Sequence, residues 1–370
     1  MLIKIKNYLQ QETVLSIAWI LAIFSMFIVT PDKNYIGYID WETLGLLFSL
    51  MIVMEGLKSM NVFRVLGEEL LKRVSTQRSL EAVLIMMCFF TSMLITNDVA
   101  LITFVPFALE TLKMAGMTKR VIPVVVLQTV AANLGSMATP IGNPQNMYLY
   151  FQSGLSPIKF MMLTLPFTLL SLGLLAAFIF ASKNRPVALN DTSIVVYTGN
   201  NKKLSVYMIM FGVCLVSLTK IFSVCIVAIA VAAVMLIMDR KILKSIDYSL
   251  LLTFVGFFIF VGNMARMPFF SNIISGLLAG NELITTIGIS QIISNVPATL
   301  LLTGFTQDWS TLIIGSNIGG LGTMIASMAS LISYKYITSS YPDSKSSYMV
   351  SFTVVNLIFL GANLGLSMII

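Results

Sequence analysis

The stretch NLGSMATPIGNP, residues 133–144, places two prolines and two glycines inside a long apolar segment. Each proline removes a backbone hydrogen bond from a helix and clashes with the preceding turn. In hydrocarbon an unsatisfied backbone group costs several kcal/mol, so a broken helix survives only where protein or a water-filled cavity satisfies the freed groups. The stretch therefore predicts a helix over residues 121–150 that is broken in its middle, with a functional site at the break.

A second break is predicted at GSNIGGLGT, residues 315–323, inside the apolar segment 308–336. The two breaks belong to a series of matches that occur in the same order in both halves. Asn133-Leu134-Gly135 with Thr139 recurs as Asn317-Ile318-Gly319 with Thr323; Ser92, Asn97 and Ala100 recur as Ser290, Asn295 and Ala298; and Asp40-Trp41 recurs as Asp247-Tyr248. Such a series indicates an internal repeat. Chance similarity among apolar helices, and close helix packing at the second break, are the alternatives.

The composition predicts a membrane protein. Of the 370 residues, 57% are hydrophobic and 11% are charged, and the mean hydropathy is +0.90, a balance that soluble globular proteins do not reach. The apolar runs have the length of about 17–25 residues that crosses a hydrocarbon core of about 30 Å. The predicted fold class is all-α and polytopic, with about nine transmembrane spans at residues 14–30, 42–60, 121–150, 157–181, 204–219, 221–238, 248–266, 308–336 and 348–369.

Two further apolar stretches, residues 79–113 and 268–306, are interrupted midway by polar or turn-forming residues. Each predicts a re-entrant helical hairpin, which enters and leaves the membrane on one face. An odd number of crossings then lies between equivalent points of the two halves, so the repeats are expected to be inverted relative to the membrane plane. The predicted domains are a first repeat, a cytoplasmic linker and a second repeat, at residues 1–181, 182–203 and 204–370.

Charge and residue usage set the orientation and exclude several functions. Lys and Arg gather in short loops that the positive-inside rule assigns to the cytoplasm, which predicts a cytoplasmic N-terminus and an outside C-terminus in the cell membrane. The same loops explain the net charge of +7, so no nucleic-acid partner is expected. The chain has no histidine, and its three cysteines lie in apolar runs without metal-ligand spacing. We therefore expect neither an enzyme nor a bound cofactor.

The predicted hairpin tips are Thr96-Asn97-Asp98 and Ser294-Asn295-Val296-Pro297. Asn97 and Asn295 carry side-chain oxygens that can cap the returning helix or coordinate a desolvated cation. Pro297 suits the first turn of a helix, because its missing N–H would be unpaired there anyway. The helix N-termini at the tips favour anions, and freed carbonyl and side-chain oxygens favour Na⁺.

Asp98 is the charged residue of these tips. A carboxylate deep in a bilayer is expensive, so it is a candidate carrier of a proton or a ligand of a sodium ion. Its structural alternative is a helix N-cap. Glu55 and Lys58 are expected to form a local pair near the end of a span.

The segment TNDVALITFVP, residues 96–106, resembles the first-hairpin motif of the arsenite-permease and small anion-permease branch of the ion transporter superfamily. Ser294-Asn295 is similar to the Ser-Asn-Thr signature of its dicarboxylate branch. The resemblance implies a homodimer in which a transport domain moves as an elevator against a scaffold. It also implies a coupling-ion site, with possible Na⁺, at Thr96, Asn97, Asp98, Asn133, Gly135, Thr139, Gly142 and Asn143, and a substrate or second-ion site at Ser294, Asn295, Pro297, Asn317, Gly319, Gly322 and Thr323.

The sequence departs from the dicarboxylate branch at Asp98 and Val296, where that branch has threonine. A carboxylate at Asp98 repels a di-anion unless a proton or a bound cation neutralises it. The preferred hypothesis is a secondary transporter that moves a small inorganic or organic anion, of the di- or tricarboxylate kind, coupled to Na⁺ or H⁺. Efflux of arsenite or antimonite, Na⁺/H⁺ exchange and an ion channel are the open alternatives.

Overall fold

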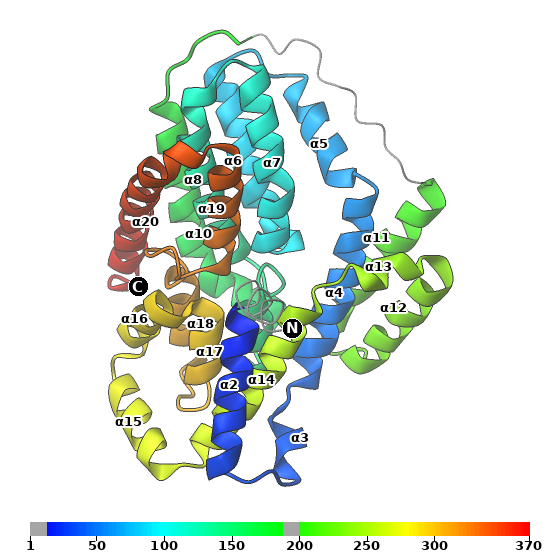
Figure 1. The fold of residues 1–370 in the computed structure, drawn as a ribbon, viewed down its shortest axis with the longest axis vertical. Coiled ribbons are helices and arrows are strands. Elements are labelled where there is room, and N and C mark those ends of the chain that lie inside the picture. Colours follow the sequence, from blue (N-terminus) through cyan, green and yellow to red (C-terminus); the bar gives the residue numbers. More distant parts are fainter. Residues whose placement is uncertain (1–12, 188–199) are drawn as a thin grey trace.

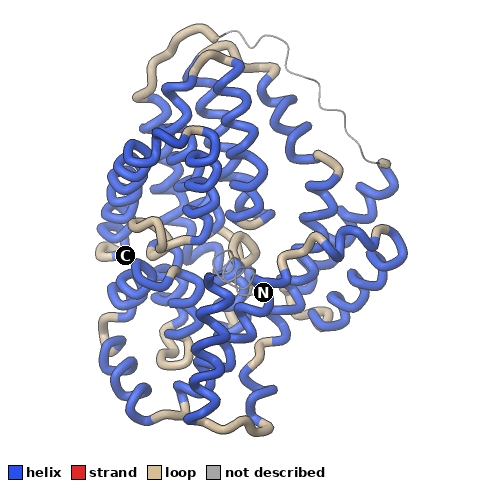
Figure 2. The backbone as a smooth tube through the Cα atoms, in the orientation of Figure 1, coloured by secondary structure: helices blue, strands red, loops and turns tan. Residues whose placement is uncertain are grey.

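The computed structural model describes residues 13–187 and 200–370. Within these ranges the chain is helical and contains no strand (Figure 1, Figure 2). The first half contains α2 (Thr13–Ile28), α3 (Asn34–Tyr38), α4 (Trp41–Ser59), α5 (Val62–Leu71), α6 (Gln77–Ile95), α7 (Asn97–Met114), the 3₁₀ helix η1 (Thr118–Arg120), α8 (Val121–Ser136), α9 (Pro144–Ser153) and α10 (Pro157–Phe180).

Within its described residues the second half is also helical. It contains α11 (Asn201–Ser217), α12 (Val224–Met238), α13 (Arg240–Lys244), α14 (Tyr248–Ala265), α15 (Pro268–Leu278), α16 (Glu282–Ile293), α17 (Asn295–Leu302), α18 (Trp309–Ile318), α19 (Met328–Ser340), the 3₁₀ helix η2 (Pro342–Ser344) and α20 (Lys345–Ser367). The middle of the predicted linker, residues 188–199, and the basic residues before residue 13 lie outside the described residues.

The described helices are those of a polytopic membrane protein. Four of them are long and apolar enough to cross a membrane, or up to six if each of two bent helix pairs counts as one span. The full set of nine spans stays a prediction. Both predicted breaks are present, because α8 stops at Ser136 before α9 begins, and α18 stops at Ile318 before α19 begins.

The second hairpin differs from the expected single helix before its tip. The chain forms two helices there, α15 and α16, which are bent by 114° to each other. The bend falls at Ala279-Gly280-Asn281, where Gly280 has a φ of 74°. Glycine adopts this conformation without steric cost, so the residue permits the turn. The turn was not predicted, because the composition of this segment is that of an uninterrupted apolar helix.

The sequence did not predict α5 as a helix of its own. It continues from α4 after a bend of 55°, and Asn61 at the bend has a φ of 57°. Asparagine is one of the few residues that tolerate this left-handed conformation. The bend turns α5 towards the first hairpin, where it packs against α6 and α7.

The long helices α4 and α14 each pack against an apolar helix from the other half of the chain. The helix α2 packs along α14, and α12 packs along α4. Away from them, α6, α7 and α8 form a bundle that α19 joins (Figure 1). The short helices α3 and α13 precede α4 and α14 respectively and contact the long helix of the other half. The breaks and the hairpin tips lie between these groups.

Candidate functional site

Both hairpin tips turn at a single strained residue. Thr96 has a φ of 67° and a ψ of 148°, and Ser294 has a φ of 75° and a ψ of 155°. This region of backbone space is nearly restricted to glycine and costs about 1–3 kcal/mol for other residues. Strain of this kind persists where the surroundings fix it, and it is typical of ligand sites. The two matched tips therefore share one unusual backbone conformation.

Each tip is tied to the break of its own half by one backbone hydrogen bond. The N–H of Asn97 donates to the carbonyl of Gly142 at 3.1 Å, and the N–H of Asn295 donates to the carbonyl of Ala326 at 2.9 Å. Ala326 lies as many residues after Thr323 as Gly142 lies after Thr139. The contact is thus the same in both halves, and it satisfies a donor at the start of each returning helix.

The matched threonines and glycines of the breaks also make matched contacts. The Thr139 hydroxyl donates to the carbonyl of Met93 at 2.5 Å, and the Thr323 hydroxyl donates to that of Gln291 at 3.1 Å. Gly135 lies so close to its hairpin that an added Cβ would stand 2.6 Å from Ser92 Oγ.

Gly319 shows the same close approach in the second half. An added Cβ there would stand 2.7 Å from Ser290 Oγ. Gly322 needs glycine for a further reason, because its φ is 104°. The breaks therefore lie directly against the helices that lead to the tips.

The two breaks are joined to each other by a pair of side-chain hydrogen bonds. Asn143 Nδ2 donates to Asn317 Oδ1 at 3.0 Å, and Ser327 Oγ donates to Asn133 Oδ1 at 3.1 Å. Ser327 occupies the position in the second half that Asn143 occupies in the first, so the two bonds are counterparts. Asn133 also accepts from Asn97 Nδ2 at 3.0 Å, which connects the first tip to the network.

Replacing Asn317 by alanine is expected to lower stability. Asn317 accepts from Asn143 and donates through Nδ2 to Asn146 Oδ1 at 2.7 Å, so its loss leaves the buried Asn146 Oδ1 without a donor, while Asn143 Nδ2 keeps its bond to Ser136 Oγ at 3.1 Å. One orphaned buried group costs about 1–3 kcal/mol, which is the loss expected in the free energy of unfolding. Thermal unfolding of the purified protein measures it. Asn356→Ala is the matched control, since the Asn356 amide donates only within its own helix; equal losses in both variants would contradict the assignment.

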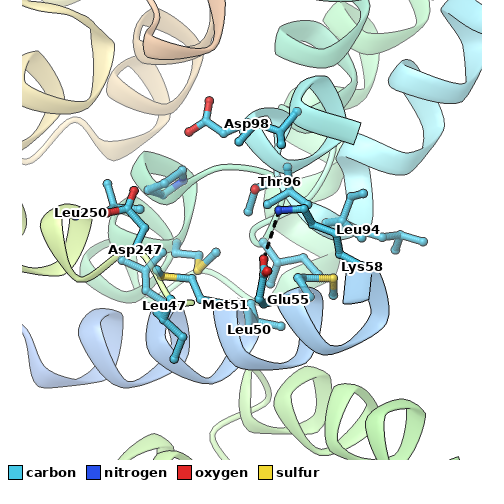
Figure 3. Close-up of a pocket in the computed structure, with 18 of the residues that line it drawn as sticks. Leu47, Leu50, Met51, Glu55, Lys58, Leu94, Thr96, Asp98, Asp247 and Leu250 are labelled. Carbon is cyan, nitrogen blue, oxygen red and sulfur yellow. Dashed lines mark hydrogen bonds and ion pairs between the residues drawn. The ribbon is translucent and has the colours of Figure 1, made fainter. Parts of the chain in front are cut away.

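A cavity of about 200 Å³ opens on the first tip (Figure 3). Its walls come from α4, from the tip and the adjoining ends of α6 and α7, from the first break and α9, and from the segment leading into α14. Apolar side chains form most of the wall. The polar side chains that line it are Glu55, Lys58, Thr96, Asp98, Ser245 and Asp247.

Asp98 supplies a half-buried carboxylate to this cavity. Among the described residues no donor reaches its Oδ1, which is shielded from solvent. The carboxylate does not cap α7, because the residue before the helix is Thr96 and the Asp98 N–H itself donates to Asn97 Oδ1 at 3.0 Å. The N-cap alternative is therefore not observed. An unpaired carboxylate oxygen in an apolar cavity is costly unless a cation or a proton occupies it.

The remaining charges of the cavity come from elements that sequence reasoning did not connect with the tip. Lys58 and Glu55 form the expected local pair, with Nζ 3.3 Å from Oε2, and both line the cavity next to Thr96 (Figure 3). Asp247 caps α14 through the N–H of Leu250 at 3.1 Å and is exposed, so the cavity reaches the surface of the protein.

The second tip does not line this cavity. Val296, the counterpart of Asp98, is 7% exposed, and its helix α17 packs against α14. Pro297 lies in the first turn of α17, in agreement with the prediction. Ser294 and Asn295 are buried beside the second break. Among the predicted site residues, side-chain hydrogen bonds join Asn97 to Asn133 and Asn143 to Asn317, whereas the second tip is tied to its break through the Ala326 carbonyl. Only the first tip lines the cavity.

Sequence reasoning missed several residues of the network. Gln291 holds the second break, donating through Nε2 to the carbonyls of Gly319 at 3.0 Å and Leu321 at 2.9 Å. A glutamine inside an otherwise apolar hairpin was the available signal. For Asn146 and Ser327 the sequence offered no signal beyond a polar residue next to a break. Asp247, on the cavity wall, resembled an ordinary helix cap.

Comparison with known proteins identifies the family. Residues 8–308 match the model of the family described as "Citrate transporter". The chain is 31% identical over 326 residues to "Inner membrane protein YbiR" of Escherichia coli K12, covering 84% of each chain. It is 30% identical over 311 residues to "Uncharacterized transporter MJ0456" of Methanocaldococcus jannaschii, covering 83% of this chain and 84% of that protein.

A shorter match carries a more specific name. The chain is 35% identical over 147 residues to "Silicon efflux transporter LSI3" from rice, Oryza sativa subsp. japonica. This match covers 40% of this chain and 30% of the rice protein. The resemblance of the tip motif is confirmed at the level of the family, and the relatives agree with an integral membrane transporter. The chain belongs to the citrate transporter family of the ion transporter superfamily.

Proposed function

We propose that this protein is a secondary active transporter that couples a small solute to Na⁺ or H⁺, with the coupling ion held at Asp98. The buried, unpaired Oδ1 of Asp98 on the cavity wall is the observation that carries the proposal. A proton or a monovalent cation removes the cost of burying this charge. Ion binding and solute binding in one cavity are thereby linked.

The charge of the cavity bears on the solute. Among the described residues that line it, Glu55, Asp98 and Asp247 are acidic and Lys58 is the one base. This balance repels a tri-anion such as citrate, so it favours a weak acid that enters uncharged or singly charged. Lys58 offers a singly charged group one cationic partner, in competition with Glu55. A small oxyacid fits this cavity better than a larger carboxylate with several charges.

We further propose that the two halves are inverted repeats that move as an elevator within a homodimer. The matched strain at the tips, the matched tip-to-break hydrogen bonds and the paired bonds between the breaks support the repeat. The bonds between the breaks join α8–α9 to α18–α19, and so favour movement of both tips as one body. The homodimer rests on the family resemblance alone.

A second candidate is efflux of an uncharged hydroxylated solute, such as arsenite or silicic acid. The mostly apolar wall and the excess of carboxylates favour a neutral solute over a multiply charged one. The name of the rice relative points the same way. The fold, the cavity and the coupling ion would be unchanged, and the direction of transport would differ.

Gradient-driven flux tests the function. Purified protein in proteoliposomes is given labelled citrate, arsenite or silicic acid, with an imposed Na⁺ or H⁺ gradient. One net charge moved through 100 mV is worth about 2.3 kcal/mol, or about 50-fold accumulation, so coupling is readily visible. We expect saturable uptake of one solute that stops when the gradient is dissipated. Uptake that ignores both gradients, or a non-saturating current, would contradict the proposal.

Replacing Asp98 by asparagine is expected to remove coupling. The amide keeps the size of the side chain but holds neither a proton nor a full negative charge for Na⁺. Solute exchange should continue while gradient-driven accumulation falls from about 50-fold to about one. Asp343→Asn, at an exposed aspartate, is the control. Accumulation by Asp98→Asn equal to that of the control would exclude Asp98 as the coupling residue.

A further inference from the structure

The single base that lines the cavity is already engaged by a carboxylate. Lys58 Nζ donates to Glu55 Oε2 at 3.3 Å, and both side chains belong to the described lining of the cavity. The pair lies near the end of α4, on the side of the helix that faces Thr96 of the first tip (Figure 3). An anion that entered the cavity would therefore compete with Glu55 for the ammonium group.

The stability of α4 gives little reason for this pair. The side chain of Lys58 is 38% exposed and that of Glu55 is 27% exposed. Two opposite charges three residues apart on a partly exposed helix surface stabilise the helix only weakly. The position of the pair inside the cavity gives it a different consequence, which is its effect on the charge of an entering solute.

The charges of the lining disfavour an anion even when the coupling ion is bound. Three carboxylates, of Glu55, Asp98 and Asp247, against one ammonium group leave two net negative charges. A proton or a monovalent cation at Asp98 reduces this to one. Removing the charge of Glu55 as well would bring the lining to neutrality and leave Lys58 free to bind an anion.

The size of the cavity makes these charges effective. A sphere of its volume, about 200 Å³, is about 7 Å across. Charges interact over such a distance, and a mostly apolar wall screens them less than water does. A solute inside the cavity thus lies within the field of the pair wherever it binds.

We propose that Glu55 determines the charge of the solute: by occupying Lys58, it makes the cavity select the uncharged form of a small oxyacid over its anion. The inference rests on the proposed function and makes the solute more specific. Glu55 and Lys58 are then specificity-determining residues, whereas Asp98 holds the coupling ion.

Glu55→Gln tests this role with two solutes of similar shape. Glutamine keeps the size of the side chain and removes its charge, so Lys58 loses its ion-pair partner. The probes are silicic acid and phosphate in mildly acidic buffer that contains Na⁺, so that either coupling ion is present. Both solutes are tetrahedral and hydroxylated, but silicic acid is uncharged there and phosphate carries one negative charge.

Thermal unfolding at increasing solute concentration measures binding without requiring transport, because a ligand of the native state raises the melting temperature. We expect phosphate to stabilise Glu55→Gln at a concentration about tenfold lower than the unaltered protein requires, since a hydrogen bond to a charged group is one of the stronger kinds. The concentration of silicic acid required should not change.

Adding Lys58→Gln to Glu55→Gln distinguishes a freed ammonium group from a mere reduction of negative charge. If Lys58 binds the anion, the double variant loses the tenfold gain in phosphate binding. A gain that persists in the double variant would overturn the role of Lys58.

Glu69→Gln is the matched control. Glu69 also pairs with a lysine three residues later, Lys72, but both side chains are exposed and neither lines the cavity. Phosphate binding by Glu55→Gln that equals that of Glu69→Gln would overturn the inference. Failure of the proposed function is separable, because it would appear as flux that ignores both ion gradients in the unaltered protein. Coupled flux together with unchanged phosphate binding in Glu55→Gln would remove only the role of Glu55.

Discussion

Alanine at position 142 is expected to abolish transport. A Cβ on Gly142 would stand 2.0 Å from the carbonyl oxygen of Ser136 and 2.7 Å from two other backbone atoms of that residue. Backbone cannot rotate away as a side chain can, so the break must open by more than about 1 Å. The Gly142 carbonyl, which holds the N–H of Asn97, moves with it. A misplacement of about 1 Å at a functional site lowers the rate of the process about 100-fold. We therefore expect the transport flux to fall by at least that factor.

Gly173→Ala is the matched control for this change. Nothing lies within 4 Å of an added Cβ at Gly173, which is inside α10. Alanine in a helix interior is favoured over glycine by about 1 kcal/mol, so this variant should keep full activity. Thermal unfolding of both variants separates loss of function from loss of fold. Gly142→Ala with normal flux would show that the tip does not depend on the break.

Removing the Arg120 side chain is expected to cause the largest loss of stability. Arg120 binds Glu81 with two parallel contacts of 2.7 and 2.8 Å, and Glu81 is 1% exposed. The hydrogen bonds to Glu81 raise the pKa of Arg120 above its ordinary value, so the guanidinium stays charged at working pH. Arg120→Ala leaves a buried carboxylate with only the Gln77 amide, at a cost of about 3 kcal/mol. We expect a melting temperature about 5 °C lower.

Two further variants locate this effect. Lys72→Ala removes an ion pair with Glu69 in which both side chains are exposed. As a control it should change the free energy of unfolding by less than about 1 kcal/mol. Adding Glu81→Gln to Arg120→Ala removes the buried charge and should restore part of the loss. If the double variant is no more stable than Arg120→Ala, the unpaired carboxylate is not the cause.

Periodicity and composition predicted the helices well, because apolar runs of membrane length have few alternatives. The two breaks were predictable for a local reason, since proline and glycine remove or weaken helical hydrogen bonds wherever they lie. The short helices α3, α5 and α13 were not predicted. They lie in loops whose sequences carry no apolar period of sufficient length, and Asn61 and Gly280 act through backbone angles that composition does not report.

The candidate site was predictable in part. Asn97, Asp98 and the breaks stood out because polar residues interrupted apolar runs. Glu55 and Asp247 did not, because each has an ordinary local explanation as an ion-pair partner or a helix cap. Their role depends on α4 and the segment before α14 meeting at the first tip, and this is a long-range contact. The difference between the tips, with Asp98 on a cavity and Val296 buried, likewise required the packed structure.

We propose that solute and cation share the cavity at Asp98. Coupling is reciprocal, so a solute gradient must drive the ion just as an ion gradient drives the solute. The most direct measurement is therefore the movement of H⁺ or Na⁺, read by a dye inside proteoliposomes, when the transported solute is added outside with no ion gradient. We expect ion movement that follows the solute in the unaltered protein and vanishes in Asp98→Asn. Solute uptake without any ion movement, or ion movement unchanged in Asp98→Asn, would contradict it.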